Sequence, residues 1–179
     1  MTRLAEWIPE PVWPQKEDNL AFGKSYQFSK KPNMKFCSSK DPELELKKLT
    51  DGVFSKTSEP IWFDSKNTVG FFEATRKGRV EITFDLERTA TIEKVMVHTA
   101  AGANGLEFPD SIQVLAGMDG THFAPVEELA PVKTENVGYR ISSLIIPLKK
   151  TDARYVRLVF LFGNYWMNCD EVAITGKWK

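Results

Sequence analysis

A two-residue alternation of apolar and polar side chains is the feature that most restricts the fold. It is clearest at Val80, Ile82, Phe84 and Leu86, and it returns at Val156, Leu158, Phe160 and Phe162. In a β-strand this period buries one face and exposes the other. Further segments with this pattern, or rich in β-branched residues, occupy 92–98, 112–116, 122–126, 141–148 and 171–175. Strands at this spacing predict an antiparallel β-sandwich.

Turn and edge residues lie between these segments. Asp119-Gly120 favours a tight turn, because glycine readily adopts positive φ. Pro147 lacks a backbone donor, so the segment 141–148 is expected at a sheet edge. The one helical candidate is 42–49, where three leucines are too few to distinguish a helix from a loop.

The length of 179 residues suits one domain with a tail. Pro9, Pro11 and Pro14 make residues 1–18 a predicted linker, since proline removes backbone donors from helices and sheets. The domain itself is expected at 19–179. Trp7 and Trp13 in the linker either pack on the flank of the domain or contact a neighbouring domain.

Charge and hydropathy exclude several partners. The chain has 24 Lys and Arg against 24 Asp and Glu, so its formal net charge is zero. Nucleic-acid binding depends on many basic contacts to phosphate, and we expect none here. No apolar run approaches the roughly 18 residues of a membrane span, so membrane insertion is not expected. Residues 1–10 show no signal-peptide pattern.

Catalytic motifs are not apparent, and we expect no enzymatic activity and no catalytic residues. The sequence has no Gly-x-Ser-x-Gly elbow and no glycine-rich phosphate loop before a helix. His98 and His122 stand at strand ends, where histidines commonly have surface or packing roles. Asp170 and Glu171 are adjacent, so in a strand they would point to opposite faces and could not both flank one bound sugar.

A set of motifs in a fixed order identifies a family resemblance. The motifs occupy residues 19–24, 49–52 followed by Trp62, 108–114, 119–123, 153–158 and 170–176. Their order resembles the coagulation-factor type C, or discoidin, domain of the galactose-binding-like superfamily, and is closest to modules appended to bacterial glycoside hydrolases. The resemblance covers about 19–176. It implies an eight-stranded jelly roll whose members bind sugars, lipids or proteins without chemistry of their own.

The same resemblance implies a structural calcium ion at the turn after Asp51-Gly52. Calcium binds six to eight oxygens, and carbonyls with a few carboxylates supply them. Asp51 would give a side-chain oxygen, Val53 a carbonyl, Thr57 a carbonyl or hydroxyl, and Glu171 a carboxylate. Many relatives have a second Asp or Asn where this chain has Val53. The alternative is that Asp51 caps its own turn and Glu171 pairs with a nearby Lys or Arg.

A sugar site needs an aromatic face and polar groups, which cluster on loops at one end of a rigid sandwich. The loops 60–73, 100–108 and 163–168 carry such residues. The predicted ligand-binding residues are Asn104, Asn164, Tyr165, Trp166, Phe71 and Phe72. Phe71 and Phe72 cannot both point inward in an extended segment. Trp166 is either a ligand platform or a hydrophobic lid, and Trp62 is expected in the core.

The two cysteines, Cys37 and Cys169, leave two possibilities open. Discoidin domains often join their ends by a disulfide, which the resemblance extends to this pair. Two buried thiols are the default, since cysteine is commonly buried without bonding.

The sequence therefore predicts a non-catalytic carbohydrate-binding module that directs a larger glycan-active or cell-surface protein to glycans. Its expected location is extracellular, periplasmic or at the cell surface, with other domains of a parent protein as further partners. One alternative is a protein-interaction or structural domain of a larger assembly. Another is a jelly-roll polysaccharide lyase, which would need a Tyr, a His and an Arg in one groove, with Tyr139 or Tyr155 as the tyrosine.

Overall fold

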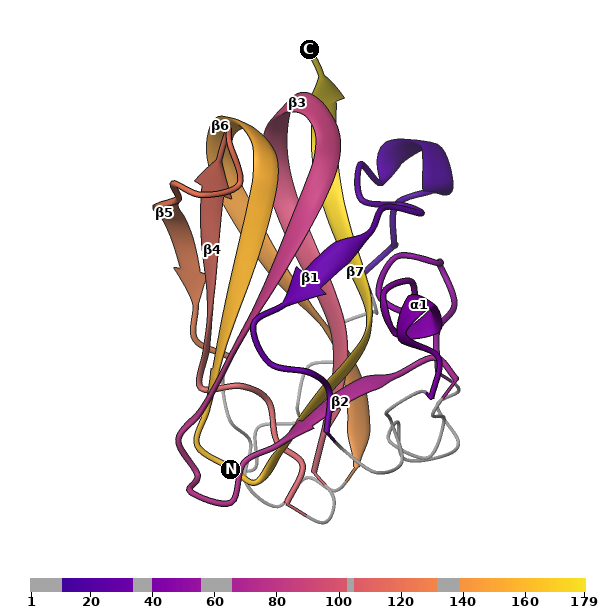
Figure 1. Ribbon diagram of the computed structural model, residues 1–179, viewed down its shortest axis with the longest axis vertical. Coiled ribbons are helices and arrows are strands. Elements are labelled where there is room, and N and C mark those ends of the chain that lie inside the picture. The colour runs from indigo at the N-terminus through magenta and orange to yellow at the C-terminus, as the bar shows by residue number, and fades with distance from the viewer. Residues whose placement is uncertain (1–10, 34–39, 56–65, 103–104, 132–138) are drawn as a thin grey trace, which may run out of the picture.

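The computed structural model describes residues 11–33, 40–55, 66–102, 105–131 and 139–179. Within these ranges the elements are η1 (Lys16–Asp18), β1 (Tyr26–Phe28), α1 (Pro42–Glu45), β2 (Val69–Phe72), β3 (Gly78–Ala101), β4 (Ser111–Gly117), β5 (Ala124–Leu129), β6 (Arg140–Phe162) and β7 (Trp166–Trp178). The strand order is β2-β7-β3-β6-β4-β5, with β1 on β3 (Figure 1). Every one of these pairings is antiparallel, as predicted.

Two long bent strands form the centre of the fold. β3 has 24 residues and β6 has 23, and they pair along most of their length. The register shifts between Asp85 and Ala90, where Glu87 has a φ of 68°. Figure 1 shows both strands curving over at the upper end of the view. The segments expected as separate strands at 80–86 and 92–98 are thus one strand, and the described residues contain seven strands rather than eight.

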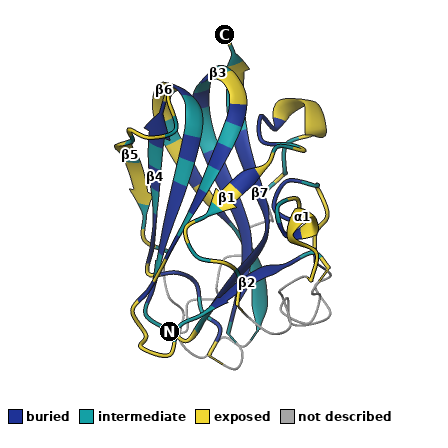
Figure 2. Cartoon of the chain, viewed as in Figure 1, coloured by how far each residue is buried: buried dark blue, intermediate teal, exposed yellow. Residues whose placement is uncertain are grey.

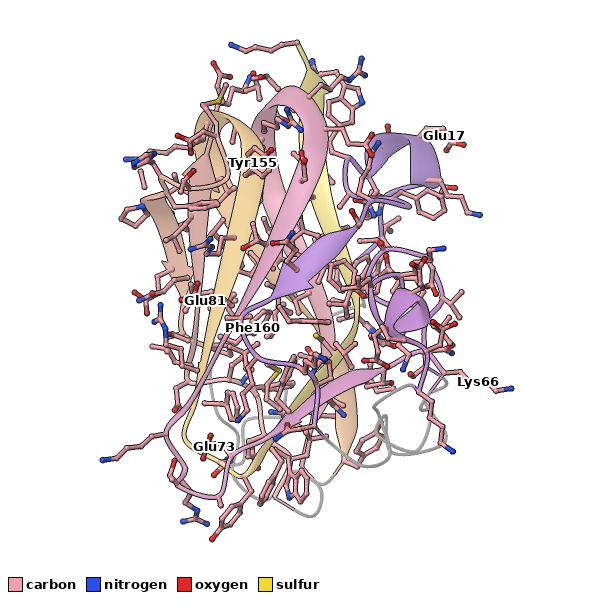
Figure 3. The ribbon with its side chains drawn as sticks, viewed as in Figure 1. Glu17, Lys66, Glu73, Glu81, Tyr155 and Phe160 are labelled. Carbon is pink, nitrogen blue, oxygen red and sulfur yellow. The ribbon has the colours of Figure 1, made fainter. Side chains whose placement is uncertain are left out.

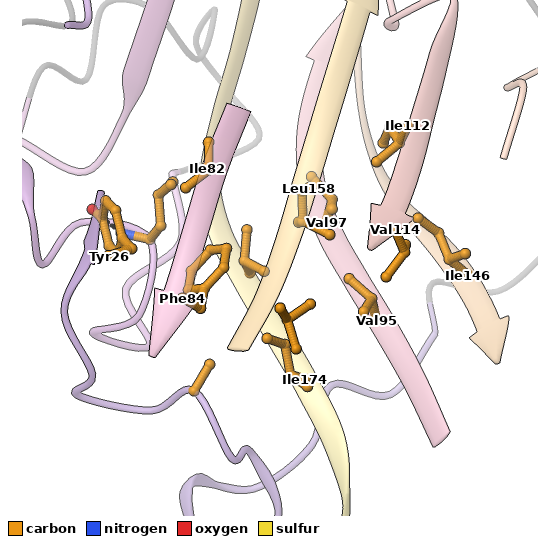
Figure 4. Packing of buried hydrophobic residues seen from close by; sticks show 14 of the residues in the cluster. Tyr26, Ile82, Phe84, Val95, Val97, Ile112, Val114, Ile146, Leu158 and Ile174 are labelled. Atoms are coloured by element: carbon orange, nitrogen blue, oxygen red, sulfur yellow. Dashed lines mark hydrogen bonds between the residues drawn. The ribbon is translucent and has the colours of Figure 1, made fainter. Parts of the chain in front are cut away.

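The core lies between the two halves of these strands. Val80, Ile82, Phe84 and Leu86 are at most 1% exposed, as their alternation predicts. Figure 4 shows Ile82 and Phe84 from the first half of β3, Leu158 from β6, and Val95 and Val97 from the second half of β3 within one buried cluster. Buried residues accordingly run along the middle of β3, β6 and β7 (Figure 2). Val172 and Ile174 of β7 belong to the same cluster, so that part of the prediction is confirmed.

The turn and edge predictions are also confirmed. Gly120 has a φ of 76° in the turn that joins β4 to β5. β4 pairs with β6 only from Tyr155 to Leu161. Among the described residues, the part of β6 that contains Pro147 therefore pairs on one side only, with β3. α1 covers just 42–45 and continues as turns, so the helical candidate proves to be a single short turn of helix.

The two ends of the described chain are fixed to the sheet. Asn19 accepts hydrogen bonds from the backbone of Ala21 and Ile174 through Oδ1, at 3.0 Å each. At the other terminus Lys179 N donates to Thr89 O, so the C-terminus lies beside the bend of β3. None of the helices among the described residues is long and apolar enough to cross a membrane. Cys169 is buried in the core, and Cys37 lies outside the described residues, so the disulfide stays a prediction.

Trp13 packs on the flank of the domain, in line with one of its two interpretations. Its indole Nε1 donates to Ser143 Oγ at 2.9 Å. Its ring meets those of Phe54 and His98 edge-on, with centroids 5.0 and 5.8 Å away. The segment before residue 19 therefore contributes contacts to the domain. Trp7 lies outside the described residues.

Replacing Trp13 by alanine should lower the free energy of unfolding by about 1–2 kcal/mol, because a half-buried ring and its hydrogen bond are lost. Urea denaturation followed by fluorescence measures this change. Val12→Ala is the control, since Val12 is 89% exposed and its loss should change nothing. Equal stability of the Trp13→Ala variant and the parent would show that this segment does not pack in solution.

Candidate functional site

An aromatic cluster gathers where β2 ends and β7 begins. β2 and β7 run antiparallel with Phe72 opposite Trp166, which brings these two predicted residues together. Their ring centroids are 4.3 Å apart. The ring of Tyr165, in the turn before β7, lies 6.3 Å from that of Phe72 with an interplanar angle of 18°. We call Phe72, Tyr165 and Trp166 the aromatic cluster.

Phe71 does not belong to this cluster. Its side chain is fully buried in the core, with its ring 5.7 Å from that of Phe28. Successive residues of a strand point to opposite faces, so Phe72 faces the cluster when Phe71 faces inward. The expectation that both cannot point inward is correct, but the assignment of Phe71 to the binding site is corrected.

The rings of the aromatic cluster differ in exposure. Tyr165 is 37% exposed and forms its outer part. Phe72 and Trp166 are half-buried against Ala100 and Leu106. The partial burial of Trp166 is compatible with both of its interpretations, a lid over these residues and a platform for a ligand.

Gly105 allows a loop to lie close against the cluster. It has a φ of 82°, which favours glycine, and a Cβ there would come within 3.3 Å of the Trp166 ring. Asn164 precedes Tyr165 and is half-buried. Asn104 and Trp62, the remaining predictions for these loops, lie outside the described residues.

A short turn after β2 places an arginine over the aromatic cluster. The guanidinium carbon of Arg76 lies 4.4 Å from the ring centroid of Tyr165. Arg76 N donates to Glu73 O at 3.2 Å and closes the turn. Figure 3 shows Glu73 at the lower end of the molecule, far from Tyr155 near the upper end. Sequence reasoning missed Arg76, because its partner Tyr165 is distant in the chain.

Glu73 is held by several donors. Lys30 Nζ donates to its Oε2 at 3.1 Å, and Thr75 donates to Oε1 through its hydroxyl at 3.0 Å and its amide at 3.3 Å. The hydrogen bond from Lys30, followed by those from Thr75, holds the pKa of Glu73 below its usual value. Both carboxylate oxygens are therefore engaged, Oε1 within the turn and Oε2 by Lys30.

A second polar site lies where the turn 51–55 crosses β7. Three acidic residues meet there, namely Asp51, Asp170 and Glu171. The turn donates backbone amides to them: Gly52 N to Glu171 Oε2 at 3.0 Å, Val53 N to Asp51 Oδ1 at 2.8 Å, and Ser55 N to Asp170 Oδ2 at 2.6 Å. The other oxygen of Asp170 is 2.5 Å from His98 Nδ1.

The expectation that Asp170 and Glu171 point to opposite sides is wrong here. β3 pairs with β7 as His98 to Glu171 and Thr99 to Cys169, so Asp170 is an extra residue in a β-bulge. A bulge locally resets the alternation, and both carboxylates reach the same turn. Asp51 does cap its own turn, as one alternative had it.

Burial dominates the electrostatics of this acidic site. It raises the pKa of Glu171 to about 9, and the charges of Asp51 and Asp170 act in the same direction. Burial also raises the pKa of Asp51. Glu171 Oε1 is buried and has no hydrogen-bond partner among the described residues. No group of three or more His, Cys, Asp or Glu side chains in the described ranges is arranged to hold a metal ion, and Thr57 lies outside them.

The histidine and arginine side chains that a lyase would need near Tyr155 form ion pairs with acidic residues. Tyr155 lies against Gly120, in the same turn as His122, so a tyrosine and a histidine do come near each other. The neighbouring basic groups, however, are bound to acids. The pairs are His122–Asp119 at 2.7 Å, Arg154–Asp85 at 2.9 Å and Arg157–Glu81 at 3.3 Å. The turn at Tyr155 therefore brings a tyrosine, a histidine and an arginine near one another, with each basic group paired to an acid.

Comparison with known proteins places the fold. Residues 36–172 match the model of the F5/8 type C domain family. No curated protein sequence gives a significant match. Three solved structures share the fold at low identity. Module CBM32-3 from a family 31 glycoside hydrolase of Clostridium perfringens is 15% identical, with 92% of this chain and 100% of that one covered and a TM-score of 0.59.

The other two structures are also small modules. Chitosan-binding module 1, from a chitosanase/glucanase of Paenibacillus sp. IK-5, is 17% identical over 88% of this chain and 98% of that one, with a TM-score of 0.57. A fucose-binding module from Streptococcus pneumoniae is 15% identical over 89% and 95%, with a TM-score of 0.56. At these identities the likeness concerns the fold.

Proposed function

The chain belongs to the F5/8 type C domain family, and on that premise we propose that it is a non-catalytic module that binds glycans. The sequence motifs resembled this same discoidin family, so that prediction is confirmed. Structures of the same fold include modules named for binding chitosan and fucose. The proposal extends their kind of ligand, a glycan, to this chain.

The observation that carries the proposal is the aromatic cluster at one end of the sandwich. Aromatic rings offer an apolar face or edge to the C–H groups of a sugar, and nearby amides and guanidinium groups bind its hydroxyls. Tyr165 is exposed, Asn164 precedes it, and Arg76 lies over its ring. Such a module would act within an extracellular, periplasmic or cell-surface protein, where glycans occur, together with further domains.

The alternative is a protein-interaction or structural domain of a larger assembly. The half-burial of Phe72 and Trp166 against the domain itself is what that alternative predicts. The exposure of Tyr165 is what glycan binding predicts. A glycan array followed by titration calorimetry distinguishes the two functions.

Tyr165→Ala should weaken glycan binding about 5- to 10-fold, because an exposed ring that contacts the ligand is lost. Calorimetry with the best array ligand measures the change in Kd. Phe123→Ala is the matched control, since Phe123 also lies beneath an arginine, at 3.9 Å from Arg157, but in the turn beside Tyr155. The proposal fails if no glycan binds. If Tyr165→Ala binds as the parent does, the aromatic cluster is not the glycan site.

We also propose calcium as a structural ion at the acidic site. One observation supports it: calcium prefers oxygen ligands, and Glu171 Oε1 is a buried oxygen with no hydrogen-bond partner among the described residues. Asp51 and Glu171 would supply carboxylate oxygens, Val53 its carbonyl, and Thr57 a further oxygen. The ion would supply positive charge that balances the crowded acids. The chain's own contribution is the turn 51–55, whose amides already hold the three carboxylates in place.

A further inference from the structure

We propose that the aromatic cluster binds an acidic glycan, and that the guanidinium of Arg76 holds the carboxylate or sulfate group of that glycan. The inference rests on the proposed glycan-binding function and specifies its ligand class. Three observations support it: the backbone conformation of Arg76, its contact with Tyr165, and the binding of Glu73 by other residues.

The backbone places Arg76 at an energetic cost. Its φ is 57°, in the left-handed region that residues with a Cβ rarely adopt. The hydrogen bond from its amide to Glu73 O holds this conformation within the turn. Backbone strain of this kind is frequent at ligand-binding sites, where the surrounding structure maintains it.

The contact with Tyr165 orients the guanidinium without using its donors. A cation over an aromatic ring is attracted by the electrons of the ring face, and the N–H groups remain available. Arg76 and Tyr165 are both exposed, so these donors face solvent. The ring of Phe72 lies parallel to that of Tyr165, and Trp166 in turn contacts Phe72.

Glu73, the acid that lies nearest to Arg76 in the sequence, does not pair with it. Glu73 already binds Lys30 through Oε2 and Thr75 through Oε1. Within the described ranges Arg76 has no ion pair, whereas Arg79, Arg154 and Arg157 each pair with an aspartate or glutamate. Lys77 follows Arg76 and is also exposed. As far as the described part of the chain shows, the turn therefore presents unpaired positive charge beside the aromatic cluster.

The chemistry of this arrangement favours an anion on the ligand. A guanidinium offers two parallel N–H donors that match the two oxygens of a carboxylate or sulfate. A glycan that carries a uronate or a sulfated sugar would place that group at Arg76 and its ring edge at Tyr165. The same charge would repel cationic sugar polymers such as chitosan.

Titration calorimetry with matched oligosaccharides tests the inference. The probes are a galacturonic acid trisaccharide, a sulfated galactotriose and an uncharged galactotriose. For the parent chain we expect at least one acidic probe to bind about tenfold or more tightly than the neutral one, the strength of a charged hydrogen-bonded pair. The two acidic probes show which anion the site prefers.

Arg76→Gln removes the charge but keeps a Cβ, so the backbone strain of the turn is unchanged. It should weaken binding of the acidic probe about tenfold or more and binding of neutral galactotriose much less, so that the acidic preference is lost. Arg76→Lys should recover part of the preference, since it restores charge without the paired donors. Arg88→Gln is the matched control: Arg88 also lies over a ring, 4.2 Å from Trp178, beside the bend of β3.

The outcomes separate this inference from the proposed function. Equal affinity of the parent for acidic and neutral probes overturns the inference and leaves glycan binding intact. An equal loss of both ligand types in Arg76→Gln also overturns it, because Arg76 would then serve any sugar. Binding of no glycan in the array and of none of the three probes overturns the proposed function itself.

Discussion

In the absence of calcium, the free energy of unfolding should fall as the pH rises from about 5 to 9. The folded chain raises the pKa of Glu171 from 4.5 to about 9 through burial. An acid that binds its proton more tightly when folded stabilises the fold fully below its unfolded pKa. That stabilisation is lost progressively as the pH rises through the folded pKa. The raised pKa of Asp51 acts in the same direction.

Calcium should reverse this trend, because the ion compensates the ionised carboxylates. At a hundredfold excess over its Kd the ion would add about 2.7 kcal/mol of stability. For a domain of this size that corresponds to a rise in Tm of roughly 5–10 °C. The rise should be largest near pH 8–9. Thermal melts from pH 5 to pH 9, with calcium or with a chelator, measure it.

Glu171→Gln is the informative variant for this prediction. An uncharged amide resembles the protonated acid, so the stability of this variant should depend less on pH than that of the parent, with the shift of Asp51 remaining, and little on calcium. Asp152→Asn is the control at an exposed carboxylate, since Asp152 binds Lys179 away from the acidic site. A parent chain with the same Tm at every pH, with and without calcium, would contradict both the metal proposal and the pKa shift.

Gly176→Ala should be the most destabilising single substitution that we propose. Gly176 pairs with Ile92 of β3, and a Cβ there would come within 2.1 Å of Thr91 O and 3.0 Å of Ile92 Cα. Both are backbone atoms, so no side chain can rotate away. The two strands must separate, and we expect a loss of about 3 kcal/mol or more. Chemical denaturation measures the loss directly.

Gly23→Ala is the comparison variant, because it introduces backbone strain without a steric clash. Gly23 has a φ of 68°, but a Cβ there would meet nothing within 4 Å. Its replacement should cost only about 1–2 kcal/mol, the penalty for a left-handed backbone. The reverse order of the two variants would mean that β3 and β7 are not packed as closely as the structure shows.

The sequence predicts the strands of the core well, because their alternation records burial directly. It cannot show that β3 is continuous, since Glu87-Arg88-Thr89 is as polar as a loop and the bend depends on pairing with β6. It also cannot place Asp170, because a β-bulge depends on the partner strand. Both failures concern contacts between segments that are far apart in the chain.

The candidate site was predictable only where its signal is local in the sequence. Asparagines beside Tyr165 and Trp166 mark a polar turn with aromatic rings, and this signal lies within a few residues. The choice between Phe71 and Phe72 requires the orientation of β2, which four residues do not determine. Arg76 acquires its meaning only from its φ and from the nearness of Tyr165.

The position of Lys179 beside the bend of β3 has a practical consequence. In Figure 1 the bend lies at the upper end of the molecule, whereas β7 begins, at the residues of the aromatic cluster, toward the lower end. A biotin or fluorophore coupled at the C-terminus would leave Tyr165 facing the bulk solution. Random amine coupling would instead modify Lys30 and Lys77, which lie beside the aromatic cluster, and would obstruct its rings. Immobilised assays should therefore anchor the protein by its tail.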